Sequence, residues 1–256
     1  DSLGSRGLGD VYKRQGYKIN IAVISGGNSE ERLVSIRTGE AVAEACNQLG
    51  YNTSIFVLDS DSIDFILNDL KAHDFVFIAL HGTFGEDGVI QSILSKNNIP
   101  FNGSDEKSSR NCFDKSVTKE IVMNQGVLSP KYYQTSSNTC NDHLDFKSEK
   151  YVVKPNSQGS SVGFNVIDNF ENLNDAIDKA LDFDNSVLIE EFIDGREITV
   201  PILGNEPLPV IEIEPKSGIY DYKSKYTAGE SKYICPADLN LEKYQFVQNC
   251  ALSVHK

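Results

Sequence analysis

INIAVISGGNS, residues 19–29, is a short run of β-branched and apolar residues that ends in a glycine turn. Runs of this composition are typical of strands buried inside parallel sheets. Ser29 suits the N-cap of a helix predicted over residues 32–49, because its hydroxyl can accept a backbone N–H, and Gly50 ends that helix. The stretch therefore predicts a strand, a tight turn and a helix in succession.

The alternation of strands and helices continues to residue 101. The pattern predicts strands at 52–58 and 75–80, helices at 63–71 and 89–96, and an extended piece at 99–101. Alternation of this kind indicates right-handed βαβ units and a parallel sheet, whose ligands bind beyond the carboxyl ends of the strands. Gly26-Gly27 and His81-Gly82 each follow a predicted strand, so we expect both at such a site.

The pattern changes after Gly103. It predicts helices at 115–124 and 173–181 and strands at 151–154, 162–167, 187–192 and 197–203, the last two with the alternation of antiparallel strands. We therefore expect an α/β protein with an N-terminal parallel-sheet domain at 17–103 and an α+β domain at 104–192. A third domain at 193–256 is predicted to be incomplete at Lys256. Residues 1–16, glycine-rich and basic, are interpreted as a disordered or non-native tail.

Composition narrows the classes of partner. The chain carries a net charge of -13, and an acidic protein repels nucleic-acid backbones and anionic lipid surfaces. No segment is as long and apolar as a membrane helix. The 5 cysteines include no CxxC pair, which suits reduced thiols. We therefore expect no nucleic acid, no membrane and a cytoplasmic location.

KPNSQGSSVG, residues 154–163, is the strongest chemical signal in the chain. A predicted strand delivers Lys154 to a loop of glycines and serines that leads into a second strand. Glycines let backbone N–H groups approach anionic oxygens and serine hydroxyls add donors, so this composition favours a phosphate cover. The spacing of a P-loop and its following helix are absent. A flexible hairpin is the alternative that composition alone leaves open.

Two acidic stretches have both a functional and a structural interpretation. EEFIDGRE at 190–197 places alternate carboxylates on a strand, where they suit ribose hydroxyls or form a solvated edge. GGNSEER at 26–32 places carboxylates at a helix start, where they bind substrate or only complement the helix dipole. Neither stretch decides between its two interpretations by itself.

Two further stretches are equally open when taken singly. His81 begins HGTFGEDG at a strand end, where it contacts a substrate or is satisfied structurally. YDYKSKY at 220–226 lies between Gly218 and Gly229 and suggests a mobile lid, with a charged surface loop as the alternative.

Taken in order, these stretches resemble the D-alanine–D-alanine ligase family of the ATP-grasp superfamily. The resemblance runs from residue 19 to the C-terminus and rests on GGNSEERLVS, LHGTFGEDG, Asp114-Lys115, KPNSQGSSVG, EEFIDGREITV, YDYKSKY and CPADL. It implies a Rossmann-like N-terminal domain followed by an ATP-grasp α+β domain and a third domain. It also implies the ATP-dependent joining of two D-alanines through an acyl phosphate, for peptidoglycan precursor synthesis, by a homodimer.

The resemblance assigns roles by position in this sequence. Glu31, Ser160 and Tyr226 match a hydrogen-bonded catalytic triad, in which Glu31 also binds the ammonium of the first D-alanine. His81 matches a residue of the first-substrate subsite. Among the matched ATP contacts, the family's lysines bind the phosphates and its two glutamates bind adenine and ribose. The backbone of the glycine-serine loop covers the phosphates. These ATP contacts are Lys115, Lys154, Gly159, Ser160, Ser161, Val162, Glu190, Glu197 and Lys225.

The family's metal ligands lie further towards the C-terminus than Lys256. We therefore expect the ligands of Mg²⁺ or Mn²⁺ beyond Lys256, and we expect residues 1–256 to be inactive alone. Three alternatives stay open: another ATP-grasp carboxylate–amine ligase, a D-alanyl-D-lactate ligase, and a non-catalytic nucleotide-binding module. The intact YDYKSKY segment resembles the dipeptide-forming type.

Overall fold

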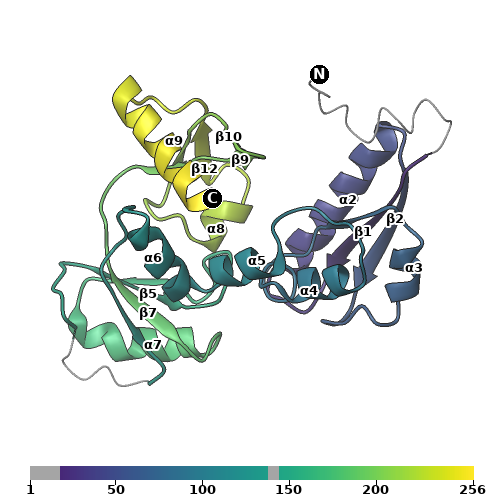
Figure 1. Ribbon diagram of the computed structural model, residues 1–256. Helices are drawn as coiled ribbons and strands as arrows, with labels where there is room; N and C mark the ends of the chain where they lie inside the picture. Colours follow the sequence, from purple (N-terminus) through teal and green to yellow (C-terminus); the bar gives the residue numbers. More distant parts are fainter. Residues whose placement is uncertain (1–17, 138–143) are drawn as a thin grey trace. The chain divides into compact units, whose positions relative to one another are not determined.

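The computed structural model describes residues 18–137 and 144–256, in two compact units, Asp1–Phe113 and Asp114–Lys256 (Figure 1). The tail predicted at residues 1–16 lies outside the described residues. The domain boundaries predicted after residues 103 and 192 stay predictions. None of the helices in the described ranges is both long and apolar enough to cross a membrane.

A parallel sheet forms the centre of the first unit, as the sequence predicts. Its strand order is β2-β1-β3, and β1 pairs in parallel with both neighbours. Strand β1 is buried from its second residue onward, which explains its continuous apolar run. Strand β2 has the predicted bounds, whereas β3 ends two residues early. The strands are β1 (Asn20–Gly26), β2 (Asn52–Leu58) and β3 (Phe75–Ile78).

Helices pack on both faces of this sheet. On one face Val23 packs with Ala43 of α2, and on the other Ile24 packs in one cluster with Ile90 of α4. Helix α2 approaches β1 closely at Gly39, where an added Cβ would lie 2.7 Å from the Ser25 Cβ. The helices of the unit are α2 (Arg32–Gln48), α3 (Leu67–Lys71), α4 (Val89–Lys96) and α5 (Glu106–Phe113).

Two predictions for the first unit are wrong at the starts of helices. Ser29 does not cap α2: the N-cap is Glu31, whose side chain makes no capping hydrogen bond. The Ser29 hydroxyl lies two residues before the N-cap, where it accepts the Glu31 N–H at 3.3 Å and donates to the His81 carbonyl oxygen at 2.7 Å. Helix α3 begins at Leu67 rather than residue 63, and the preceding turn still buries Ile63 and Ile66.

The second unit begins with an antiparallel sheet of order β4-β7-β5-β6. Helices α6 and α7 have the bounds that the sequence predicts, and α7 buries Leu173, Ile177 and Ala180 against the sheet. Strand β6 begins at Asn165 instead of residue 162, because the residues before it hold positive φ angles. The elements are α6 (Lys115–Asn124), β4 (Tyr132–Thr135), β5 (Tyr151–Pro155), β6 (Asn165–Ile167), η1 (Phe170–Asn172), α7 (Leu173–Leu181) and β7 (Val187–Glu191).

The remainder of this unit holds a second antiparallel sheet, of order β12-β11-β8, and the two-stranded β9–β10 pair. The single strand predicted at 197–203 is divided in two, because Pro201 has no N–H for a ladder. The elements are β8 (Glu197–Thr199), β9 (Ile202–Leu203), β10 (Glu206–Pro207), β11 (Ile211–Pro215), α8 (Tyr222–Tyr226), β12 (Ser231–Ile234) and α9 (Leu241–His255). The predicted α/β class, a parallel sheet followed by antiparallel ones, is confirmed.

Candidate functional site

In the first unit, Glu31 and His81 meet at the carboxyl edge of the parallel sheet. Glu31 is buried at the start of α2, and His81 follows β3. Gly82, the residue after His81, has a φ of +71°, and a Cβ added there would lie 3.0 Å from the Glu31 Oε2 atom. The close approach explains why a glycine stands at this position. A buried carboxylate at this edge of the sheet can accept a substrate ammonium group.

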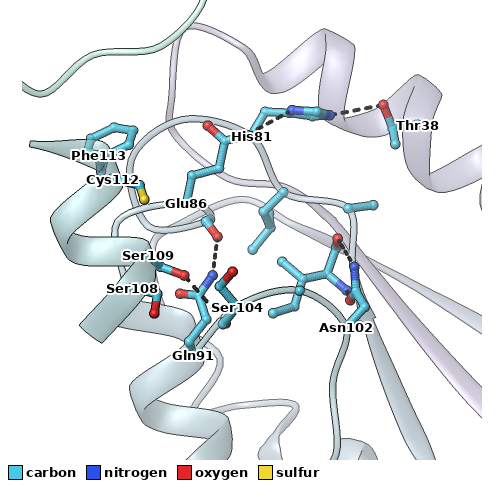
Figure 2. A pocket seen from close by; sticks show the side chains of 15 residues that line it. Thr38, His81, Glu86, Gln91, Asn102, Ser104, Ser108, Ser109, Cys112 and Phe113 are labelled. Atoms are coloured by element: carbon cyan, nitrogen blue, oxygen red, sulfur yellow. Dashed lines mark hydrogen bonds and ion pairs between the residues drawn. The ribbon is translucent and has the colours of Figure 1, made fainter. Parts of the chain in front are cut away.

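The His81 ring is held from both sides (Figure 2). Its Nε2 atom lies 3.1 Å from the Thr38 Oγ1 atom, and its Nδ1 atom lies 3.4 Å from the Glu86 Oε1 atom. The hydrogen bond with Glu86 raises the pKa of His81 above its usual value, and the negative charge of Glu31 acts in the same direction against burial. His81 therefore tends towards the charged form and presents a fixed face to a ligand.

The loop after His81 is shaped by its own acidic residues. Glu86 accepts the Gly82 N–H at 3.0 Å, and Asp87 accepts the N–H groups of Phe84 at 2.8 Å and Val89 at 3.0 Å. These bonds stabilise a loop in which Phe84 is buried with a φ of 69°. The acidic part of the HGTFGEDG stretch thus positions the loop.

A cavity of about 460 Å³ opens beside His81 within the first unit (Figure 2). Its wall combines the ends of the sheet with helices α4 and α5. Gln91 lies in this wall and donates to the Gly85 carbonyl at 2.7 Å. The other side chains that Figure 2 labels in the wall are Thr38, Glu86, Asn102, Ser104, Ser108, Ser109, Cys112 and Phe113.

In the second unit, Lys115 and the phosphate loop, residues 154–163, form one structure. Lys115 begins α6, which Asp114 caps by accepting the Val117 N–H. The Lys115 ammonium donates to the Asn156 carbonyl at 3.1 Å and to the Gln158 carbonyl at 2.6 Å. Burial, and then the neighbouring charge of Lys154, lower the pKa of Lys115 to about 8. A lysine ammonium that is desolvated and lies near another cation is stabilised by an anionic ligand.

Glu190 occupies the middle of the same region, on β7. Its Oε2 atom lies 2.6 Å from the Lys154 Nζ atom, and its Oε1 atom lies 2.8 Å from the Lys119 Nζ atom. Oε1 makes no directed hydrogen bond, so its contact with Lys119 is an ion pair at short range. Lys119 was not among the residues singled out from the sequence. The only signal for it is its spacing of four residues from Lys115 on the predicted helix.

The tip of the phosphate loop contacts the Tyr–Lys segment, residues 218–229. The hydroxyls of Ser160 and Tyr226 share a short hydrogen bond, and the Ser161 hydroxyl donates to the Tyr220 carbonyl at 3.1 Å. Ser160 and Ser161 have φ angles of 49° and 59°, which turn the loop sharply. The Val162 N–H closes this turn by donating to the Gly159 carbonyl at 3.0 Å.

Lys225 and Glu197 lie close to the same segment. The Lys225 ammonium lies 5.3 Å from the centre of the Tyr220 ring, a cation–π distance. Burial raises the pKa of Glu197, and the charge of Lys225 opposes that shift. Burial and a 3.0 Å hydrogen bond to Tyr233 raise the pKa of Tyr220 to about 12, so this phenol stays neutral.

The predicted site residues thus fall into two groups, one in each unit. Glu31 and His81 belong to the first unit, and the predicted ATP contacts, with Tyr226, belong to the second. Glu31 as a member of a triad with Ser160 and Tyr226 stays a prediction. Within residues 18–137 and 144–256, no group of three or more His, Cys, Asp or Glu side chains could hold a metal ion. The described residues thus hold no ready-made cluster of metal ligands, and we derive no step through a metal.

Comparison with known proteins identifies relatives along most of the chain. Sequence models described as D-ala D-ala ligase C-terminus and N-terminus match residues 121–256 and 62–104. The D-alanine--D-alanine ligase of Methylacidiphilum infernorum is 41% identical over 233 residues, which cover 91% of this chain and 74% of that protein. A crystal structure of D-alanine--D-alanine ligase from Bacillus anthracis covers 93% of this chain and 78% of its own, with a TM-score of 0.79 and 32% identity. The Bacillus anthracis ligase complexed with ATP covers 93% and 77%, with a TM-score of 0.77 and 29% identity.

Proposed function

Because the chain belongs to the D-alanine–D-alanine ligase family, we propose that it binds ATP and joins two D-alanines to D-alanyl-D-alanine. The carboxylate of the first D-alanine takes the terminal phosphoryl group of ATP, which forms an acyl phosphate and ADP. The amine of the second D-alanine then attacks the acyl carbon, and inorganic phosphate leaves. Phosphorylation is needed because a carboxylate oxygen is a poor leaving group.

The observation that carries this proposal is the hydrogen bond between Ser160 and Tyr226. It connects the tip of the phosphate loop with the Tyr–Lys segment. In this proposal the loop that covers the phosphates therefore also holds the Tyr226 phenol beside the reacting atoms. Holding the reactants in one covered pocket supplies orientation and excludes water, which would otherwise hydrolyse an acyl phosphate. Ser160 and Tyr226 in this proposal position the amine of the second D-alanine.

Charge in the second unit supports the nucleotide part of the proposal. Lys115, Lys154 and Lys225 supply cations that offset the negative charge of the phosphates during transfer. The turn from Gly159 to Val162 shapes the backbone that covers the phosphates, with the hydroxyls of Ser160 and Ser161 at its tip. Glu190 and Glu197 are the proposed acceptors for adenine and ribose.

The first unit supports the amino-acid part. The buried carboxylate of Glu31 is proposed to receive the ammonium group of the first D-alanine, and His81 lines the same subsite. Glu31 and the charged form of His81 together suit a ligand that carries an ammonium and a carboxylate group. A free amino acid has both groups.

The substrate is tested by product analysis. The complete gene product is incubated with ATP and D-alanine, and then with D-alanine plus D-lactate or D-serine, and ADP release and products are measured by mass spectrometry. We expect D-alanyl-D-alanine as the main product at neutral pH, with L-alanine as the inactive control. A main product that contains lactate or serine would reassign the second substrate, and no amino-acid-dependent ADP release would contradict the ligase function.

Three further expectations belong to this proposal. Turnover should depend on Mg²⁺ or Mn²⁺ and vanish when a chelator removes the metal. Residues 1–256 alone should release no ADP, and dipeptide formation by them would contradict that prediction. A cytoplasmic homodimer stays a prediction, which sedimentation of the purified protein and fractionation of cells would test.

A further inference from the structure

Lys119 is a buried lysine that the proposed chemistry does not use. It lies on α6, and only 9% of its side chain is exposed. Its ammonium donates to the Ser129 hydroxyl at 2.9 Å and to the Pro130 carbonyl at 3.1 Å, and it lies 2.8 Å from Glu190 Oε1. The Tyr132 ring packs against it, with 5.2 Å between the ring centre and the Lys119 Nζ atom. Every side of this cation is therefore occupied by protein groups.

Lys154 holds the other oxygen of the same carboxylate in a different environment. Its side chain is 23% exposed, whereas that of Glu190 is 5% exposed. Among the described residues, Glu190 is the acidic residue that Lys154 pairs with, at 2.6 Å between Nζ and Oε2. Of the two lysines on Glu190, Lys154 is thus the one that can reach a ligand, and Lys119 is fixed on the inner side.

From this asymmetry we infer that Lys119 is a positioning residue, which keeps Glu190 paired from the inner side so that Lys154 can exchange the carboxylate for a nucleotide phosphate. The inference rests on the proposed function, because it assumes that Lys154 binds a phosphate of ATP.

The reason is the cost of an unpaired buried charge. A buried carboxylate that loses its last cation is strongly destabilised, because desolvation is no longer compensated. If Lys119 were neutral, Lys154 would be the only cation on Glu190 and would stay there. With Lys119 in place, Glu190 keeps a counter-charge when Lys154 turns to the phosphate. The exchange therefore costs less free energy.

The test is calorimetric titration of the complete gene product with ATP, for the wild type, Lys119→Gln, Lys119→Arg and the surface control Lys179→Gln. We expect Lys119→Gln to weaken ATP binding about tenfold, the lower end of the loss that removing an outer-shell partner causes at metal sites. Lys119→Arg keeps the charge and should stay within about twofold of the wild type. Lys179 is exposed on α7, so its variant should bind like the wild type.

A second background separates positioning from simple structural support. In a Glu190→Gln protein Lys154 is not held by a carboxylate, so adding Lys119→Gln should change ATP affinity less than about twofold. A lysine that only supports the turn at Ser129 and Pro130 would weaken binding equally in both backgrounds. Circular dichroism of each variant verifies that the fold is intact.

The outcomes distinguish the inference from the proposed function. Wild-type affinity in folded Lys119→Gln, or an equal loss in the Glu190→Gln background, would overturn the inference and leave the ligase proposal intact. If Lys119→Gln does not fold, a folded Lys119→Arg that binds about tenfold more weakly would also overturn it. A wild type that does not bind ATP would contradict both, whereas ATP binding with the expected pattern but without ligase activity would contradict only the proposed function.

Discussion

The affinity for ATP should fall about tenfold between pH 7 and pH 9, because Lys115 loses its proton in that range. Burial and the charge of Lys154 lower the pKa of Lys115 to about 8 in the protein without nucleotide. A phosphate beside the ammonium favours the charged form, so the pKa rises when ATP binds. A lysine that binds as the cation therefore loses affinity as the pH rises through its ligand-free pKa of about 8.

The magnitude follows from the fraction of Lys115 that is charged. With a pKa of about 8, about nine-tenths is charged at pH 7 and about one-tenth at pH 9, which corresponds to about 1.4 kcal/mol of binding free energy. At pH 8 the protein should take up about half a proton per ATP bound. Proton uptake is measured by titration calorimetry in buffers that differ in ionisation enthalpy.

The matched control is Lys115→Arg, which stays charged throughout this range. Its affinity should change less than about twofold between pH 7 and pH 9, and it also reports any effect of ATP's own ionisation. Equal affinity of the wild type at both pH values would refute the reasoning. An identical slope in Lys115→Arg would assign the pH dependence to another group.

Three other perturbations test the site and the fold. Ser160→Ala and Tyr226→Phe each remove the hydrogen bond between these residues, so each should lower kcat about three- to tenfold, and unchanged ADP release in both would remove the bond from the mechanism. Gly82→Ala places a Cβ 3.0 Å from the Glu31 carboxylate at a φ of +71°, so the KM for D-alanine should rise about tenfold or more while ATP affinity stays constant. An equal loss of ATP affinity would instead indicate damage to the whole fold. Asp114→Ala removes the N-cap of α6 and should lower the free energy of unfolding in urea by about 1 kcal/mol, whereas Asp114→Asn, which keeps a capping oxygen, should change it by less than half as much.

Local patterns predict the regular elements well where their causes are local. Helices α4, α6 and α7 and strand β2 have the predicted bounds. In α6 the cause is visible, since Asp114 provides the cap. Predictions were wrong at some segment ends. Helix α2 has Glu31 as its N-cap, while the Ser29 hydroxyl donates to the distant His81 carbonyl. Strand β6 begins late, because Gly163 inside the predicted strand has a positive φ angle.

Several elements were not predicted at all. Strands β4, β11 and β12 and helix α9 are among them. Strand β4 is only four residues long, which is too short for a clear period-two pattern, and it pairs with β7. Helix α9 buries none of its residues, so it lacks the apolar stripe by which an amphipathic helix is found.

By itself, the sequence determined the α/β class, the strand–loop–strand form of the phosphate loop and the types of residue that could bind ATP and an amino acid. Only the tertiary structure decided which of them meet. Ser160 contacts Tyr226 although they are 66 positions apart, and Glu190 pairs with both Lys154 and the unpredicted Lys119. The physical reason is that such contacts depend on sheet register and on the cost of burying a charge, and neither is encoded in the periodicity of a single segment.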